Sequence, residues 1–276
     1  ASIVIAGLMA KTGAYGLLRF AIPLFPEAAA RFAPIAMAFA VIGLLYGAVA
    51  AFGQTDAKRT LAYASLSHVG LITLGVFAWT QLAMQGVVFQ MVCHGIILAA
   101  LFWLVGALDA RIHTRDFRQI SGLWASLPRL GGVTLLFALA LMGLPGLGSF
   151  VGEFLVLLGT FSGHEVFAII AALGMIAAVI YALWLVQRVF HGESRADWHV
   201  PDLTRRELGL LAALIVLIVG LGLYPQPVLD TVEPSLANLR QGTATTFVAE
   251  PPPSSGPAVV FPDGKAQLSR AGGEAR

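Results

Sequence analysis

Long apolar runs separated by short polar stretches dominate the chain. A helix needs about 20 mainly apolar residues to cross a membrane, so these runs predict transmembrane helices. The polar stretch GQTDAKR at 53–59 and the loop at 109–129 mark two of the boundaries. We predict seven spans, at about residues 1–25, 33–52, 59–79, 82–108, 131–161, 166–189 and 208–224.

The run at 131–161 is interrupted by GLPGLG at 143–148. Pro145 removes a helical hydrogen bond, and Gly146 and Gly148 relax the backbone. Each half has about 13 residues and would be about 20 Å long, which is shorter than the hydrocarbon core of about 30 Å. We therefore expect one helix broken at this segment, and not two separate spans.

The distribution of basic residues supports a single broken span. With one span at 131–161, ten basic residues fall on one side of the membrane and two on the other, whereas two spans would give six and six. Because cytoplasmic loops carry an excess of Lys and Arg, we expect the basic loops to be cytoplasmic and the C-terminus to lie outside. The ten are Lys58, Arg59, Arg111, Arg115, Arg118, Arg129, Arg188, Arg195, Arg205 and Arg206, and the two are Arg19 and Arg31.

Composition agrees with an all-α polytopic membrane protein. Hydrophobic residues make up 58% of the chain and charged residues only 12%, about half the charged fraction of a soluble domain. The net charge of +2 gives no sign of nucleic-acid binding. We expect a transmembrane domain over 1–232 and a disordered tail over 233–276, where PPPSSGP occurs. Because an apolar run is already under way at Ala1, we also expect the chain to be a fragment that lacks its N-terminal half.

The sequence predicts no cofactor or metal site within the chain. Cys93 is the only cysteine, so an intrachain disulfide, an iron–sulfur cluster and a c-type haem attachment motif are excluded. The two histidines inside predicted spans are 26 residues apart, with no carboxylate at helical spacing to complete a metal site.

Four ionisable residues nevertheless lie deep inside four different spans: Lys11, His68, His94 and Glu153. A charge at a helix centre costs about 2.5–3.5 kcal/mol on insertion scales, and such residues commonly mark ion or proton pathways. Histidine changes charge near neutral pH, and discontinuous helices often mark ion sites near the membrane midplane. The pattern therefore favours proton transfer. Three structural alternatives remain open: a lysine that reaches the membrane surface, a structural ion pair for the glutamate, and packed polar histidines.

Four long motifs carry a resemblance to a known family. They are AKTGAYGLLRFAIPLFPEAAARFAPIA, QTDAKRTLAYASLSHVG, FQMVCHGIILAALFWLVGALDARIHTRDFRQISGLW and GLPGLGSFVGEFLVLLGTF. Over residues 1–232, the chain resembles the antiporter-like subunits of respiratory complex I, the proton-translocating NADH:quinone oxidoreductase, and their M type in particular. The resemblance implies the second half of an inverted-repeat fold of the bacterial inner membrane.

The resemblance also implies roles for particular residues. Lys11 matches the central lysine of the family, His68 and His94 match its connecting axis, and Glu153 matches the acidic residue on the broken helix. The family's upstream glutamate and lysine have no counterpart here. NADH, flavin, iron–sulfur clusters and quinone are then expected in partner subunits, with neighbouring antiporter-like subunits and lipid around this chain. A cation/proton antiporter, a membrane-bound hydrogenase and a purely structural bundle remain alternatives.

Overall fold

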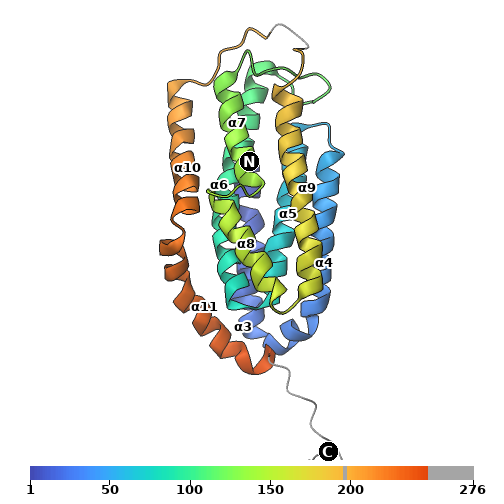
Figure 1. Cartoon of the computed structure of the whole chain (residues 1–276), viewed down its shortest axis with the longest axis vertical. Coiled ribbons are helices and arrows are strands. Elements are labelled where there is room, and N and C mark those ends of the chain that lie inside the picture. Colours follow the sequence, from blue (N-terminus) through green and yellow to red (C-terminus); the bar gives the residue numbers. More distant parts are fainter. Residues whose placement is uncertain (195–197, 248–276) are drawn as a thin grey trace, which may run out of the picture.

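The computed structural model describes residues 1–194 and 198–247, and every regular element in these ranges is a helix. The longer helices run side by side along the long axis of the molecule (Figure 1). Six segments are long and apolar enough to cross a membrane, in agreement with the predicted all-α membrane fold. They are Ser2–Leu24, α4 (Pro26–Phe52), α5 (Ala57–Ala78), α6 (Gln81–Ile112), α9 (Glu165–Phe190) and α10 (Arg205–Leu223).

The first segment is a composite of short pieces. Two π-helical turns interrupt it, and such wide turns occur often at functional sites. Lys11 lies just after the first of them. The pieces are α1 (Ser2–Val4), η1 (Ile5–Met9), α2 (Ala10–Gly16), η2 (Leu17–Ala21) and α3 (Ile22–Leu24), where η denotes the π-helical turns.

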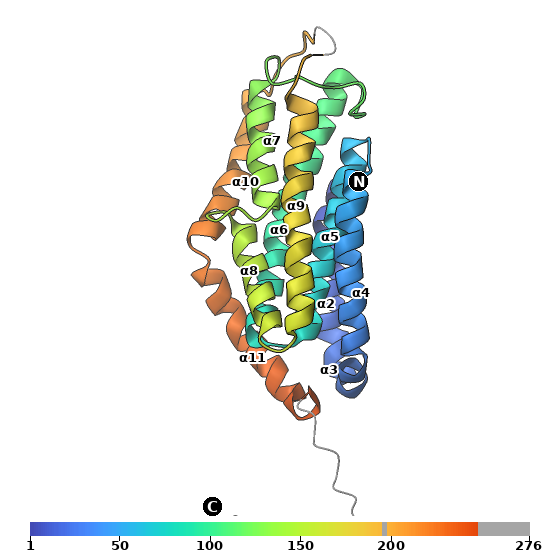
Figure 2. The same ribbon diagram turned by 45° about the vertical axis from the view of Figure 1, so that its right-hand side comes forward.

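The predicted helix break is confirmed. Helices α7 (Pro128–Leu141) and α8 (Gly148–Phe161) lie end to end in both views (Figures 1 and 2). Each has 14 residues and is about 21 Å long, so the two together complete one crossing. Residues 142–147 form the non-helical connection. Gly143 and Gly146 have φ values of 74° and 95° there, a conformation that favours glycine, whereas Gly148 is already the first residue of α8.

The second span begins earlier than the sequence analysis predicted. We expected it to start at 33, after a turn formed by PLFPEAAARF, but α4 begins at Pro26 and the turn is reduced to Phe25. Proline is well tolerated at the first position of a helix, where no hydrogen-bond donor is needed. The alanines that follow Pro26 favour a helical conformation. Helix α4 also continues past Pro34, which lies inside it.

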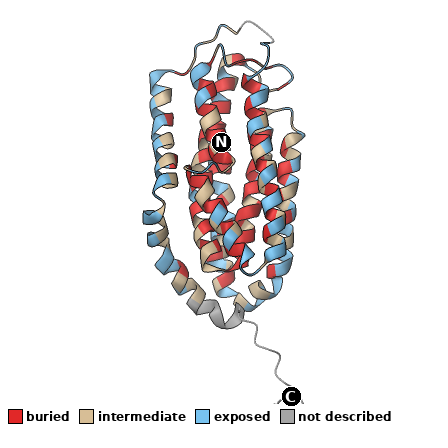
Figure 3. Cartoon of the chain, viewed as in Figure 1, coloured by how far each residue is buried: buried red, intermediate tan, exposed pale blue. Residues whose placement is uncertain are grey.

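Two pairs of helices pack with their backbones in contact at glycines. A Cβ atom on Gly70 of α5 would lie 2.6 Å from the carbonyl oxygen of Ala40 on α4. A Cβ atom on Gly86 of α6 would lie 2.6 Å from the backbone nitrogen of Val156 on α8. Small residues allow such close approach between membrane helices. Buried residues line the interior of the bundle, while exposed ones follow its outer faces (Figure 3).

Helix α11 (Gln226–Phe247) follows α10 and runs obliquely from about half the height of the bundle to one of its ends, in contact with α6 and α4 (Figures 1 and 2). Leu236 is its buried contact residue. Residues 233–247, which the sequence analysis placed in the tail, belong to this helix. The rest of that tail, 248–276, lies outside the described residues.

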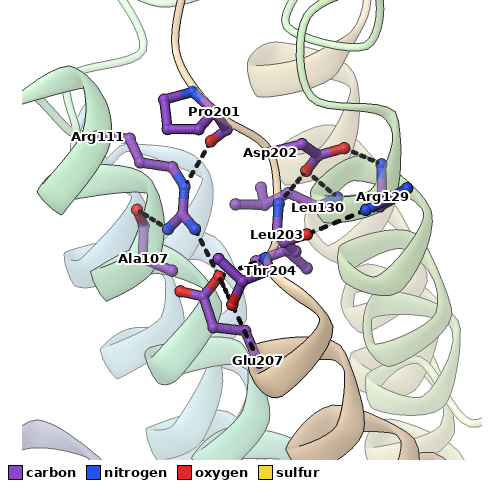
Figure 4. Close-up of polar contacts among 9 residues, drawn as sticks. All are labelled: Ala107, Arg111, Arg129, Leu130, Pro201, Asp202, Leu203, Thr204 and Glu207. Atoms are coloured by element: carbon purple, nitrogen blue, oxygen red, sulfur yellow. Dashed lines mark hydrogen bonds and ion pairs between the residues drawn. The ribbon is translucent and has the colours of Figure 1, made fainter.

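At the opposite end, the segment before α10 fastens three helices together (Figure 4). The Asp202 carboxylate accepts hydrogen bonds from the backbone N–H groups of Arg129 (2.8 Å) and Leu130 (3.1 Å), and so caps the start of α7. The guanidinium of Arg111 on α6 donates to Glu207 Oε2 on α10 (2.7 Å). These contacts hold the ends of α6, α7 and α10 in a defined arrangement below the basic loops.

Candidate functional site

The four ionisable residues singled out from the sequence are all buried in the structure. None of them is more than 6% exposed, so each side chain is shielded within the helix bundle. They come from four elements: Lys11 from α2, His68 from α5, His94 from α6 and Glu153 from α8. The structure brings three of them into one cluster and leaves Lys11 at its edge.

His68 and Glu153 form the centre of this cluster. His68 Nε2 lies 3.4 Å from Glu153 Oε1 and 3.1 Å from the carbonyl oxygen of Leu141. Both neighbours are acceptors, so an Nε2–H group would have two partners here. The contact joins α5 to the break between α7 and α8.

The helix break makes the Leu141 carbonyl available. In a continuous α-helix, this oxygen would accept the N–H of the residue four positions later. That residue is Pro145, which has no N–H group. The proline therefore leaves the buried Leu141 carbonyl oxygen without its helical donor. His68 Nε2 lies within hydrogen-bond distance of this oxygen.

The other nitrogen of His68 also has partners. Nδ1 lies 3.0 Å from the carbonyl oxygen of Ala64, one turn earlier on α5. It also lies 3.2 Å from the hydroxyl oxygen of Tyr181 on α9. Both nitrogens of this buried ring therefore face hydrogen-bonding groups.

His94 stacks on the face of the His68 ring, whereas the partners described above lie at the ring nitrogens. The two rings stack with their centroids 4.7 Å apart and an interplanar angle of 18°. His94 is fully buried, and neither of its ring nitrogens has a hydrogen-bond partner among the described residues. Because an unpaired buried polar group is costly, this ring is a strong candidate for exchange with mobile hydrogen-bonding partners such as water.

Lys11 reaches the cluster from the first segment. Its ammonium group donates to the carbonyl oxygen of Ala6 in the first π-helical turn. It also lines a groove of about 540 Å³ between this segment and α6, whose lining is apolar apart from Lys11, Thr12 and Tyr15. No hydrogen bond joins Lys11 to His94 within the described residues.

Sequence reasoning missed two uncharged residues that hold Glu153 in place. Ser149 Oγ donates to Glu153 Oε1 at 2.6 Å, and Gln90 Nε2 donates to the same oxygen at 3.1 Å. Gln90 also donates to Ser149 Oγ at 3.0 Å. Both residues are fully buried. The signal that could have found them is a glutamine inside an apolar span and a serine one helical turn before the glutamate.

Imidazole and carboxylate side chains are of types that can exchange protons. The described residues contain no group of three or more His, Cys, Asp and Glu side chains that could hold a metal ion. Cys93 is buried against the start of α8 at Gly148. An ion-pair partner for Glu153 was one structural alternative, and the pairing found is with a titratable imidazole.

The break connection predicts a difference between two glycine substitutions. Gly146→Ala should destabilise the protein by about 1 kcal/mol, because alanine is strained at positive φ and its Cβ would meet nothing within 4 Å. Gly143→Ala should be clearly worse, because its Cβ would overlap Oε2 of Glu153. Thermal stability of the purified protein in detergent measures both effects. Equal losses for the two variants would contradict the close packing of Glu153 against the break.

Comparisons with known proteins place this arrangement in context. The family model described as NADH:quinone oxidoreductase/Mrp antiporter, transmembrane, matches residues 1–180. NADH-quinone oxidoreductase subunit M of Pseudomonas aeruginosa is 49% identical over 250 residues, which are 90% of this chain and 49% of that protein. Subunit M of Escherichia coli is 47% identical over 243 residues, 87% of this chain and 48% of that protein. The chain thus spans about half the length of these relatives.

Solved structures give the same picture. Respiratory complex I from Thermus thermophilus with bound NADH contains a chain that superimposes with a TM-score of 0.78 at 36% identity, over 83% of this chain and 49% of that chain. A chain of the Mrp complex from Dietzia superimposes with a TM-score of 0.76 at 22% identity, over 90% of this chain and 55% of that chain. At 22% identity, the similarity to the Mrp chain shows a shared fold alone.

Proposed function

Because the chain belongs to the NADH:quinone oxidoreductase/Mrp antiporter family of transmembrane proteins, we propose that it works as a proton-translocating part of subunit M in respiratory complex I. Residues 1–232 would form the second half of that subunit's membrane domain. Its similarity to subunit M of two bacteria, at 49% and 47% identity, supports this assignment over other members of the family.

The buried file of ionisable groups is the observation that carries the proposal. Glu153, His68 and His94 follow one another in space. The Glu153 carboxylate oxygen lies 3.4 Å from His68 Nε2, and the ring centroids of His68 and His94 are 4.7 Å apart. Lys11 would continue the file beyond His94. Protons would pass along Lys11, His94, His68 and Glu153. The unpaired nitrogens of His94 would take part through water that bridges to Lys11.

The energy requirement of this transfer is modest. Moving one proton against 100 mV needs about 2.3 kcal/mol, a size that the rearrangement of one buried ion pair can supply. NADH, flavin, iron–sulfur clusters and quinone would be bound by other subunits, so this chain would receive its driving force from neighbouring membrane subunits.

The same proposal sets an orientation. The loops that carry most basic residues lie at the end of the bundle where Arg111 and Arg129 anchor the segment before α10. By the positive-inside rule this end would face the cytoplasm of a bacterial cell. The opposite end of the bundle, towards which α11 runs, and the C-terminus would then lie on the outer side.

A second candidate is a multisubunit cation/proton antiporter. The family model spans both kinds of protein, and the fold similarity to the Mrp complex is nearly as high as that to complex I. The lower sequence identity to the Mrp chain, 22% against 36%, favours complex I.

Purification of the complete membrane complex with a tag on this subunit separates the two candidates. We expect NADH:quinone reductase activity to co-purify, and we expect vesicles with the reconstituted complex to acidify on NADH addition in the absence of sodium. Sodium-dependent proton flux in a complex without quinone reductase activity would refute the proposal in favour of the antiporter.

A further inference from the structure

Tyr181 contacts the proton file at a point that no sequence motif indicates. Its ring is 1% exposed on α9 and packs edge-on against Phe52, with 6.4 Å between ring centroids. Its hydroxyl oxygen lies 3.2 Å from Nδ1 of His68. A cavity of about 10 Å³ next to the ring is lined mainly by apolar side chains such as Leu101 and Leu185, and this volume is at the lower limit for a single water. The hydroxyl therefore depends on protein partners.

The hydroxyl of Ser67, the neighbour of His68 on α5, is engaged elsewhere. It donates to the carbonyl oxygen of Leu44 at 2.9 Å. Among the described residues, the hydrogen-bond partner of the Tyr181 hydroxyl is Nδ1 of His68. A phenolic O–H can donate and accept, so Tyr181 can donate to Nδ1 whenever that nitrogen carries no proton.

The two partners of Nδ1, the Tyr181 hydroxyl and the Ala64 carbonyl oxygen, suit two charge states of His68. When the ring is neutral with its proton on Nε2, that N–H donates to Leu141 or Glu153, and Tyr181 donates to the bare Nδ1. When the ring carries a proton on each nitrogen, Nδ1–H donates to the Ala64 carbonyl oxygen at 3.0 Å. In both states each nitrogen of the ring keeps a partner.

The remaining charged and titratable groups that face His68 are already in the file. Glu153 lies on the Nε2 side at 3.4 Å, and His94 stacks on the ring face. Among the described residues, neither of them forms a hydrogen bond with Nδ1, whose partners are Ala64 and Tyr181. Ala64 offers an acceptor alone, because a carbonyl oxygen has no proton to donate. Tyr181 is thus the donor to Nδ1 when His68 is neutral.

We propose that Tyr181 is a positioning residue for proton transfer, whose hydroxyl donates to Nδ1 of neutral His68 and so keeps the proton of the imidazole on Nε2, which faces Glu153. This inference rests on the proposed function. It goes beyond it by assigning a role to α9, which carries none of the four ionisable groups of the file.

The test is Tyr181→Phe in the complete complex. Phenylalanine keeps the packing against Phe52 and removes only the hydroxyl. Loss of one neutral hydrogen bond in one charge state predicts a fall of about three- to tenfold in the rate of proton translocation. Tyr46→Phe, the same change on an exposed residue of α4, should leave the rate unchanged.

Two further measurements separate this role from a structural one. Incorporation of a ring-fluorinated tyrosine at position 181 restores the hydroxyl and should restore translocation. In a His68→Gln background, Tyr181→Phe should cause no additional loss, because the hydroxyl acts through the imidazole. A wild-type rate in Tyr181→Phe, a failure of the fluorinated residue to restore it, or an additive loss in the double variant would overturn the inference.

The same set of variants distinguishes a failure of this inference from a failure of the proposed function. A wild-type rate in His68→Gln alone would count against the proton file as a whole. An impaired His68→Gln together with a normal Tyr181→Phe would overturn only the role of Tyr181.

Discussion

Glu153→Gln is expected to lower proton translocation by the complete complex by at least about tenfold, since a positioned proton-transfer group commonly contributes more than that. Glutamine matches the shape of glutamate, and its amide oxygen can still accept the hydrogen bonds from Ser149 and Gln90. The variant loses only the carboxylate that faces His68. Proton uptake in membrane vesicles, measured with a pH-sensitive dye while NADH is oxidised, gives the rate.

The matched control for this variant is Glu165→Gln. Glu165 is exposed in the first turn of α9, so the same chemical change there should leave translocation at the wild-type rate. Assembly is checked by the amount of the complex on a native gel. Translocation at the wild-type rate in Glu153→Gln would remove the carboxylate from the pathway.

Lys11→Met should have a comparable effect, a loss of about tenfold or more in the same vesicle assay. The amine is buried at the edge of the groove and bonded to the Ala6 carbonyl oxygen. Methionine fills a similar volume without a titratable group. Lys58→Met, in the first turn of α5, is the matched control and should be close to wild type.

A second substitution tests whether the charge or the proton matters at this position. Lys11→Arg keeps the positive charge, but a guanidinium does not release its proton. We expect this variant to be impaired as well. Normal translocation in Lys11→Arg would show that Lys11 acts as a fixed charge and does not carry protons.

The membrane architecture could be predicted because it depends on local sequence. An apolar run of sufficient length has few structural solutions in lipid, and Pro145 with its neighbouring glycines cannot continue a regular helix. Boundaries were harder where the same residues permit two readings. Pro26 can end one helix or begin the next, and the structure uses it to begin α4.

The candidate site could be predicted only in part. Lys11, His68, His94 and Glu153 were found because an ionisable group in an apolar span is unusual in itself. Whether they contact one another depends on the rotation and crossing of the helices, which span-level reasoning does not provide.

The supporting hydrogen bonds escaped prediction for the same reason. Gln90 and Ser149 are significant because both aim at one oxygen of Glu153. Tyr181 is significant because α9 turns its hydroxyl towards α5. An uncharged polar residue in a span can form a hydrogen bond within its own helix or with any neighbouring helix. Its role is therefore recognised only when its partner is known.

Close glycine contacts hold the helices of the site against one another. Gly86 brings α6 against α8, and Gly70 brings α5 against α4. Gly75 of α5 in turn lies close to Val87 of α6 and Val156 of α8. Since α5 carries His68 while α6 and α8 carry His94 and Glu153, a small displacement of α5 against these two helices would alter the stacking on His94 and the contact with Glu153 simultaneously.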